Sequence, residues 1–335
     1  MKTTKQALEE FIKNKVNLDP KETDKARSSR DWLISQINSL PSKFDDFPNL
    51  YRERHIKFGS FARRTKIRPL DDIDLIITFS ASDNEGNRAS YSHNLLDDTC
   101  YIHVPEEHKT LRKFCDEDGL LNSRKILEKL KSYLSEIPQY SQAEIHRRQE
   151  AVTLKLSSYP WNFDIVPAFF TVKDSNGRDY YLIPDGNGNW KKTDPRIDQK
   201  RVSEINQRQG GKALEFIRLL KYWKKKNFSA VSSYLFENFV LNFLERETLQ
   251  ANLLVNPMSF FHYLQTAVYR PVYDPKGIQG NINSLDLFTK VRVCRKAEED
   301  KRKAYKAYKY EKEQEHERAI KELREIFGKE FPNYE

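Results

Sequence analysis

The sequence lacks the features that mark membrane proteins, secreted proteins and thiolate metal sites. No apolar run approaches the roughly 18 residues that a membrane span requires. The three cysteines, Cys100, Cys115 and Cys294, are far apart and form no CxxC pair, so we expect reduced thiols. The first residues, "MKTTKQALEEFIKNKVNL", include acids and read as an amphipathic helix, not as a signal or transit peptide. These absences together predict a cytoplasmic protein with no membrane partner.

Several common catalytic motifs are also absent. There is no GxSxG stretch and no Ser/His/Asp arrangement, so nothing supports a serine hydrolase. The "GNG" at 186–188 lacks the strand-to-helix setting and the following lysine of a P-loop, and we interpret it as a turn. His103 and His146 have no partner pattern for a metal or a nucleophile, so we interpret both as surface or hydrogen-bonded histidines.

What the chain does contain is enough apolar material for a sizeable core. Its 335 residues are 38% hydrophobic, with 20 Phe, 17 Tyr and 4 Trp, which suits one large domain or two lobes. Charged residues make up 32%, and the mean hydropathy is −0.80, as in soluble globular proteins. The net charge of +9 favours anionic partners such as nucleotides or nucleic acid, although solvated surface lysines would produce the same excess.

The first half of the chain mixes strand and helix patterns. A β-branched run at 72–79, "DIDLIITF", is bounded by Pro69 and a polar turn, and predicts a strand. Residues 81–118 are polar and irregular, so we expect a long surface excursion there. Further strands are expected at 151–158, 161–170 and 180–184, the first two forming a hairpin, and helices at 5–17, 22–40 and 122–138.

From about residue 195 the periodicity becomes helical and stays so. Helices are expected at 211–226 and 232–247, followed by a long charged helical region whose alternating charges favour a solvated face over contact with nucleic acid. We therefore predict two lobes, a sheet-containing one at 1–185 with N-terminal helices and a helical one at 186–335. The natural ligand site is a cleft between them.

Two aspartates occupy alternate positions of the expected strand at 72–79. Asp72 and Asp74 stand on the same face because side chains alternate along a strand, while Ile73 and Leu75 point into the core. Adjacent carboxylates repel each other unless a cation neutralises them. Hard oxygen ligands suit Mg²⁺, and a pair of such ions activates an attacking hydroxyl and stabilises a leaving oxygen in phosphoryl transfer.

A third carboxylate completes this site if two strands are neighbours. Asp164 lies within the apolar run "WNFDIVPAFF", where an unpaired acid would be costly. If that strand lies beside 72–79, Asp164 joins Asp72 and Asp74 in a three-aspartate site. Asp71 lies in the wrong register and is interpreted as a strand-entry residue. The alternative is that the first two acids cap a turn and Asp164 is structural.

Gly59 and Ser60 precede the aspartates and suit a phosphate. Glycine lets the backbone approach a phosphate closely, and the Ser60 hydroxyl and amide are able to donate to it. The basic residues that follow, Arg63, Arg64 and Lys66, have two open interpretations: they touch the substrate, or they offset the nearby acids.

The spacing of these residues resembles the polymerase-β-like nucleotidyltransferase superfamily, whose motif is hG[GS], nine to thirteen residues, then Dh[DE]h. Here Phe58–Ser60 is followed by eleven residues and then Asp72–Leu75. Within that superfamily the chain resembles the CD-NTases, bacterial relatives of cGAS and the 2′-5′-oligoadenylate synthetases that make cyclic nucleotide signals in CBASS anti-phage defence. The supporting stretches are "NFDIVPAF" (162–169), "IPDGNGNWKKTDP" (183–195), "RLLKYWKKK" before "SSYLFENFV", and "IFGKEFPNY" (326–334).

The resemblance implies an α+β fold, with a polymerase-β-like nucleotidyltransferase lobe that contains a mixed sheet and helices, and a C-terminal helical lobe. The active site would lie in the cleft between the lobes. It also implies that Asp72, Asp74 and Asp164 hold two Mg²⁺ ions, for which Mn²⁺ is a substitute, and that Gly59 and Ser60 hold the donor triphosphate. Asp164 would help to activate the acceptor hydroxyl.

In the helical lobe the resemblance implies three further nucleotide-binding residues. Lys221 would reach the triphosphate, Ser233 would hydrogen-bond beside it, and Tyr234 would stack on the donor base. From the residues alone, a lysine within "KYWKKK" is typical of a solvent-facing position and Tyr234 is more typical of a core.

The resulting hypothesis is a metal-dependent nucleotidyltransferase that makes a cyclic di- or trinucleotide second messenger from ATP or other NTPs and releases pyrophosphate. The alternatives are an enzyme that makes linear oligonucleotides or modifies RNA ends, and an RNA-sensing nucleotide-binding protein. We expect a monomer. Its positive charge is compatible with nucleic-acid binding, but the proposed reaction does not require a nucleic acid. A downstream effector would respond only to the cyclic product.

Overall fold

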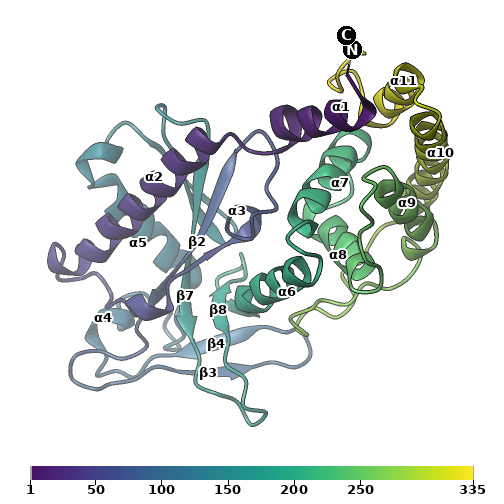
Figure 1. Ribbon diagram of the computed structural model, residues 1–335. Coiled ribbons are helices and arrows are strands. Elements are labelled where there is room, and N and C mark those ends of the chain that lie inside the picture. The colour runs from purple at the N-terminus through teal and green to yellow at the C-terminus, as the bar shows by residue number, and fades with distance from the viewer. Residues whose placement is uncertain (1, 335) are drawn as a thin grey trace. The chain divides into compact units, whose positions relative to one another are not determined.

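The computed structural model describes residues 2–334 and divides into two compact units (Figure 1). The sheet unit comprises Pro20–Ala62 and Leu70–Arg196. The helical unit comprises the residues up to Asp19, the segment Arg63–Pro69 and the residues from Ile197 onward. These units do not coincide with the expected division into 1–185 and 186–335. The cleft expected between two lobes remains a prediction.

Within the described residues, nine strands of the sheet unit form one mixed sheet. Their order is β1-β2-β7-β8-β9-β4-β3, with β6 also paired to β7 and β5 paired to β6. The pair β2 and β7 is parallel, and the other pairs are antiparallel. The strands are β1 (Ile56–Phe58), β2 (Asp72–Phe79), β3 (Ser90–His93), β4 (Cys100–His103), β5 (Glu144–Arg148), β6 (Ala151–Lys155), β7 (Asn162–Phe170), β8 (Tyr181–Pro184) and β9 (Trp190–Thr193).

Helices of the sheet unit contact its strands, among them α3, which contacts β1 and β2. α5 contacts β5, β6 and β8. Tyr133 of α5 packs on Phe47, with ring centres 4.7 Å apart, and Phe47 in turn lies 5.7 Å from Phe79 of β2. The helices are α2 (Pro20–Ser39), α3 (Gly59–Ala62), α4 (Lys109–Arg112) and α5 (Ser123–Ser135). The strand that carries two of the aspartates therefore ends inside an aromatic core.

The hydrophobic pattern explains why β2 and β7 lie at the centre of the sheet. After the acidic positions, residues 75–79 of β2 are all buried, and so are residues 165–169 of β7. Parallel strands covered on both faces read as continuous apolar runs, which is what both sequences contain. The strands expected at 72–79, 161–170 and 180–184 are confirmed, as is the hairpin of β6 and β7.

The expectation of an irregular surface excursion at 81–118 is wrong. This stretch contains β3 and β4, which extend the sheet beyond β9, and the short helix α4. β3 alternates between exposed and half-buried residues and lies at the edge of the sheet. Its sequence, "SYSH", has too little apolar content to show a strand periodicity, so only the pairing with β4 identifies it.

The helical unit is built around one large apolar cluster to which its helices contribute. The helices expected at 211–226 and 232–247 are confirmed within three residues at either end. The long helix α10 carries ion pairs one turn apart, such as Lys303 with Glu299 at 2.6 Å, which supports the interpretation of a solvated face. The helices are α1 (Thr4–Phe11), which continues as a π-turn through Val16, α6 (Pro195–Arg208), α7 (Ala213–Asn227), α8 (Ser233–Leu244), α9 (Val255–Ala267), α10 (Leu287–Lys312) and α11 (His316–Phe327).

Long-range packing explains why the unit boundaries differ from the expected ones. Phe11 of α1 lies 5.0 Å from Tyr222 and 4.9 Å from Phe331, measured between ring centres, so the N-terminal helix belongs with the C-terminal ones. At the other boundary, β8 and β9 continue the sheet past residue 185. Neither fact follows from local periodicity.

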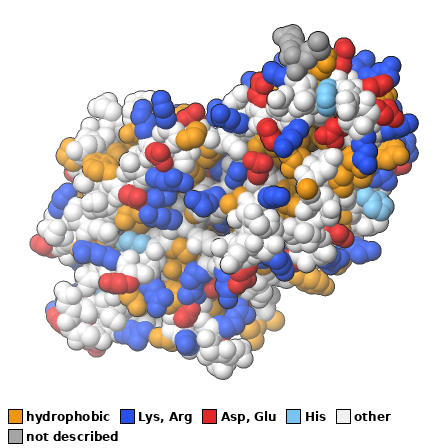
Figure 2. Space-filling view, in the orientation of Figure 1, with side chains coloured by type: hydrophobic (Ala, Val, Ile, Leu, Met, Phe, Trp, Pro, Cys, Tyr) orange, Lys and Arg blue, Asp and Glu red, His pale blue; other side chains and the backbone are white. Residues whose placement is uncertain are grey.

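Two further observations concern the helices and the surface charge of the described residues. None of the helices formed by residues 2–334 combines the length and the apolar content needed to cross a membrane. Figure 2 shows acidic side chains scattered among the basic ones on the face that it draws.

His55 links the aspartate-bearing strand to α2 and gives the sheet unit a pH-dependent contact. Its Nδ1 accepts the backbone N–H of Thr78 at 3.0 Å, and its Nε2 lies 3.0 Å from Oδ1 of Asn38. Burial, together with the nearby charge of Arg52, lowers the pKa of His55 from 6.5 to about 4. The imidazole is therefore neutral in the folded protein at neutral pH.

Acidification is consequently expected to destabilise the fold between about pH 6.5 and pH 4. In this window the unfolded chain binds a proton at His55 that the folded chain does not, so stability is lost as the pH falls. The shift corresponds to at most about 3 kcal/mol. The melting temperature of His55→Gln should lose this part of the pH dependence, while the control His103→Gln should keep it. An unchanged pH dependence in His55→Gln would contradict the assignment.

Candidate active site

The sheet unit brings the three predicted aspartates onto one face. Asp72 and Asp74 are the first and third residues of β2. In the parallel pairing with β7, Asp72 lies opposite Asn162 and Asp74 lies opposite Asp164. Positions directly opposite each other on neighbouring strands share a face, as do alternate positions along one strand. The predicted placement of these two strands side by side is confirmed, and Ile73, between the two acids, is buried on the other face.

Gly59 lies against one of these carboxylates. It follows β1, whose last residue, Phe58, pairs with Asp74, and it begins the short helix α3, with Ser60 as the second residue. Gly59 has φ of +72°, and a Cβ added there would stand 1.7 Å from Oδ2 of Asp74. Only glycine combines this backbone conformation with so close an approach. The Gly-Ser turn and the aspartate are therefore parts of one local structure.

A residue that sequence reasoning missed fixes the third aspartate. Thr153 of β6 lies opposite Asp164 in the antiparallel pairing, and its Oγ1 donates a hydrogen bond of 2.6 Å to Oδ1 of Asp164. The Thr153 side chain is buried, so this hydroxyl has a defined partner and orientation. The available signal was weak: a threonine in the strand "AVTLK" is ordinary strand composition.

Thr153→Val is expected to lower turnover by about 10- to 100-fold, because residues that orient a catalytic carboxylate typically contribute that much. Valine keeps the β-branched shape and removes only the hydroxyl. Steady-state kcat is the measurement, and Thr153→Ser is the control, since it retains the donor. If Thr153→Val turned over like the wild type, Asp164 would not depend on this hydrogen bond.

The donor chemistry of this face fits a hard cation. Carboxylate oxygens on one sheet face are the ligands that Mg²⁺ prefers, and a neighbouring hydroxyl already orients one of them. Among residues 2–334, no three His, Cys, Asp or Glu side chains are already gathered at metal-binding distances. The carboxylates therefore supply suitable ligands without a preassembled cage, and the metal role remains a prediction.

The helical unit places Lys221 in a buried ion pair. Nζ of Lys221 on α7 donates 2.9 Å to Oε2 of Glu237 on α8, and the two side chains are 6% and 2% exposed. The same carboxylate accepts from Nε of Arg63 and from Oγ1 of Thr65, both at 2.8 Å. The neighbouring lysines in the sequence suggested that Lys221 faces solvent. The structure shows instead that its side chain is buried.

Glu237 holds this cluster together electrostatically. Burial raises the pKa of its carboxyl, but the charges and hydrogen bonds of Arg63 and Lys221 outweigh that effect and lower the pKa below the ordinary value. The sequence had left two interpretations of Arg63 open, contact with the substrate or compensation of nearby acids. In the structure Arg63 pairs with Glu237, a buried acid of the same unit. The signal in the sequence was a glutamate in the apolar run "SYLFENFVLNFL", because charged residues are rarely fully buried unless they are paired.

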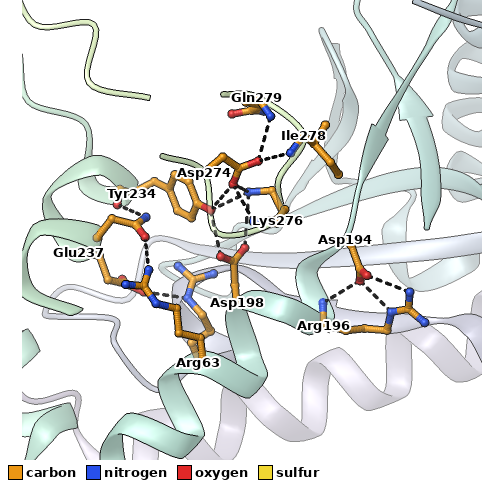
Figure 3. A network of polar contacts seen from close by, with 12 residues as sticks. Arg63, Asp194, Arg196, Asp198, Tyr234, Glu237, Asp274, Lys276, Ile278 and Gln279 are labelled. Atoms are coloured by element: carbon orange, nitrogen blue, oxygen red, sulfur yellow. Dashed lines mark hydrogen bonds and ion pairs between the residues drawn. The ribbon is translucent and has the colours of Figure 1, made fainter. Parts of the chain in front are cut away.

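Ser233 and Tyr234 are the first two residues of α8. Ser233 is exposed at the first position of the helix, and the neighbouring Ser232, not Ser233, caps it by accepting the N–H of Leu235 at 3.1 Å. Tyr234 is half-buried, and its hydroxyl reaches Asp198 and Asp274, at 2.9 and 3.2 Å (Figure 3). Sequence reasoning missed both of these acids, which lie 36 and 40 residues away along the chain.

Comparison with known proteins adds both sequence and fold relatives. A probable cyclic nucleotide synthase from Bacillus cereus (strain VD146) is 47% identical over 336 residues, covering 100% of this chain and 99% of the relative. The cyclic AMP-AMP-AMP synthase of Escherichia coli (strain MS 115-1) is 23% identical over 254 residues, or 76% of this chain and 65% of the relative. No protein-family model matches.

The structure of E. coli MS115-1 CdnC with ATP shares the fold, with a TM-score of 0.72 and 18% identity over 99% of both chains. This agreement confirms the predicted α+β class, a mixed sheet with helices and a helical C-terminal part.

Proposed function

The chain belongs to the CD-NTase family of cyclic nucleotide synthases, and from this premise we propose that it joins NTPs into a cyclic di- or trinucleotide through Asp72, Asp74 and Asp164. The observation that carries the proposal is the register of β2 and β7, which sets Asp74 opposite Asp164 while Gly59 lies against Asp74. An accidental pair of turn acids would not acquire a third carboxylate and a glycine contact on the same face.

The reaction we propose is an in-line displacement. A ribose hydroxyl of one nucleotide attacks the α-phosphorus of another, a new P–O bond forms, and the bond to the leaving pyrophosphate breaks. Asp164, oriented by Thr153, takes up the hydroxyl proton. A second displacement of the same kind closes the ring. Orientation of the two nucleotides supplies much of the rate.

The metal requirement follows from the carboxylates. We propose that Asp72, Asp74 and Asp164 bind two Mg²⁺ ions, with Mn²⁺ as a substitute. Such ions, when bound, favour ionisation of the attacking hydroxyl and offset charge on the leaving oxygen. The chain itself supplies the three carboxylates, the Gly59–Ser60 turn for the donor phosphates, and the hydrogen bond that orients Asp164.

The helical unit is proposed to bind the donor nucleotide. We propose that the Lys221 ammonium, which has three N–H donors and gives one to Glu237, uses another to contact the triphosphate and keeps that ion pair. Ser233 is exposed at the start of α8, and we propose that its hydroxyl is a further hydrogen-bonding partner for the nucleotide. Tyr234 provides an aromatic surface for the base, and such stacking contributes about 1–3 kcal/mol per base.

The cellular role we propose is synthesis of a second messenger in CBASS anti-phage signalling, carried out by a cytoplasmic monomer. A downstream effector would bind only the cyclic product. The 47% identity to a probable cyclic nucleotide synthase over the whole chain supports the reaction. The defence role rests on the family to which the chain belongs.

The decisive experiment identifies the product. The protein is incubated with Mg²⁺ or Mn²⁺ and four labelled NTPs, the mixture is treated with phosphatase, and resistant products are identified by mass spectrometry. A protected cyclic species is expected, and its mass would name the bases and the ring size. Exclusively linear products, or turnover that depends on added RNA, would instead favour an oligonucleotide-forming or RNA-sensing protein.

A further inference from the structure

The hydroxyl of Tyr234 lies in a buried polar network that none of the roles assigned so far requires. Asp198 of α6 lies 2.9 Å away, and Asp274, in the loop between α9 and α10, lies 3.2 Å away. Nζ of Lys276 donates to the hydroxyl at 2.6 Å. Figure 3 shows the three side chains converging on this end of the Tyr234 ring.

The members of this network leave the tyrosine little freedom to turn. The side chains of Asp198, Asp274 and Lys276 are only 11%, 0% and 7% exposed. A phenol has one proton and accepts through its oxygen, so Tyr234 donates to one carboxylate at a time while it accepts from Lys276. Rotating the ring away would break both bonds and leave buried charged groups without this partner, which is costly.

Asp274 is itself held in place by its own loop. Its Oδ1 accepts the backbone N–H of Lys276 at 3.2 Å, and its Oδ2 accepts those of Ile278 and Gln279 at 3.3 and 3.1 Å. Lys276 lies 2.8 Å from Asp274 and 3.7 Å from Asp198, so the single ammonium links both acids. Contacts within the chain therefore fix the positions of the groups that surround the Tyr234 hydroxyl.

We propose that Asp198, Asp274 and Lys276 are positioning residues that hold the Tyr234 ring in one orientation and so set where the donor base stacks. This inference rests on the proposed function, in which Tyr234 contacts the base. An aromatic platform that is fixed in advance loses less conformational entropy when the base binds than one that must first be ordered. The positioning residues come from two separate segments of the helical unit, α6 and the loop between α9 and α10.

The test separates the ring of Tyr234 from its hydroxyl. Tyr234→Phe keeps the aromatic surface and removes the contact with the network, whereas Tyr234→Ala removes both. ATP and GTP binding and steady-state kinetics are measured for these variants and for Asp198→Asn and Asp274→Asn, with melting temperatures to verify folding. Tyr305→Phe, at a 57% exposed position of α10, is the matched control for loss of a phenol hydroxyl.

The proposed positioning of the Tyr234 ring predicts a specific pattern of effects. Tyr234→Phe and each folded Asp variant should raise KM for the NTP about three- to tenfold with a smaller change in kcat, and Tyr305→Phe should change neither. Combining Tyr234→Phe with Asp274→Asn should cost little more than either change alone, because both act through one contact. A role confined to stability would lower the melting temperatures and leave KM unchanged.

Failure of the positioning role and failure of the base contact give different results. If Tyr234→Ala weakens NTP binding but Tyr234→Phe binds like the wild type, the positioning role of the network is overturned and the contact between Tyr234 and the base is supported. If Tyr234→Ala binds ATP and GTP like the wild type, the base contact itself is wrong. If Tyr234→Phe weakens binding while the folded variants Asp198→Asn and Asp274→Asn do not, the hydroxyl acts without these partners. The positioning role of the network is then also overturned.

Discussion

Replacing Asp72 or Asp74 with asparagine is expected to lower cyclic nucleotide synthesis by at least about 100- to 1000-fold, the range typical for loss of one key electrostatic group at a reacting phosphate or carbonyl. Asparagine has the same shape and nearly the same volume, so the strand pairing of β2 with β7 should persist. Both aspartates are only half-buried, and neither contributes to the apolar side of the strand. The loss should therefore appear in kcat and not in the melting temperature.

The adjacent aspartate offers a matched control for this prediction. Asp71 precedes β2, and its backbone oxygen accepts the N–H of Asn162 at 2.9 Å, an interaction that a side-chain change leaves intact. Asp71→Asn removes the same charge one residue away and should keep most of the activity. Near-normal product formation by Asp72→Asn or Asp74→Asn would show that these carboxylates are not the catalytic ones. Equal losses in all three variants would indicate a general effect of charge.

Gly59→Ala is expected to have an effect of similar size for a steric reason. The added Cβ would lie 1.7 Å from Oδ2 and 2.5 Å from Cγ of Asp74, a separation that real atoms do not adopt. The φ of +72° adds strain of about 1–2 kcal/mol for any residue with a side chain. Asp74 or the turn must move, so we expect turnover to fall at least about 100-fold, measured as kcat with the melting temperature as a check on folding.

Gly177 separates the steric effect from the backbone strain. It lies between β7 and β8 with φ of +73°, and an added Cβ would meet nothing within 4 Å. Gly177→Ala should therefore lose a similar amount of stability and retain activity. If both variants lost activity equally, the contact with Asp74 would not be the reason for the glycine at position 59.

The sequence was most informative where local rules apply. Alternation along a strand placed Asp72 and Asp74 together, and the apolar context of Asp164 indicated a second strand. The expected placement of that strand beside the first is confirmed by the register. The edge strand β3 was missed because four residues with little apolar content carry no detectable periodicity. Its pairing with β4 is a contact that the local pattern does not encode.

The helical unit shows where sequence reasoning ends. Lys221 was placed by resemblance, but its partner Glu237 lies 16 residues away, and the second cation, Arg63, lies 174 residues from Glu237 along the chain. Likewise, the hydroxyl of Tyr234 meets an acid from α6 and another from the α9–α10 loop. No spacing rule connects these positions.

The sequence by itself determined the family, the α+β class and the alternation that sets two carboxylates on one face, because these follow from short-range geometry and from a spaced motif. Only the tertiary structure decided that α1 packs with the C-terminal helices, that Thr153 orients Asp164, and that buried charges surround Lys221 and Tyr234. The physical reason is that a charge or hydroxyl taken out of water must find a partner in space. Which partner it finds depends on how distant segments pack and not on their order along the chain.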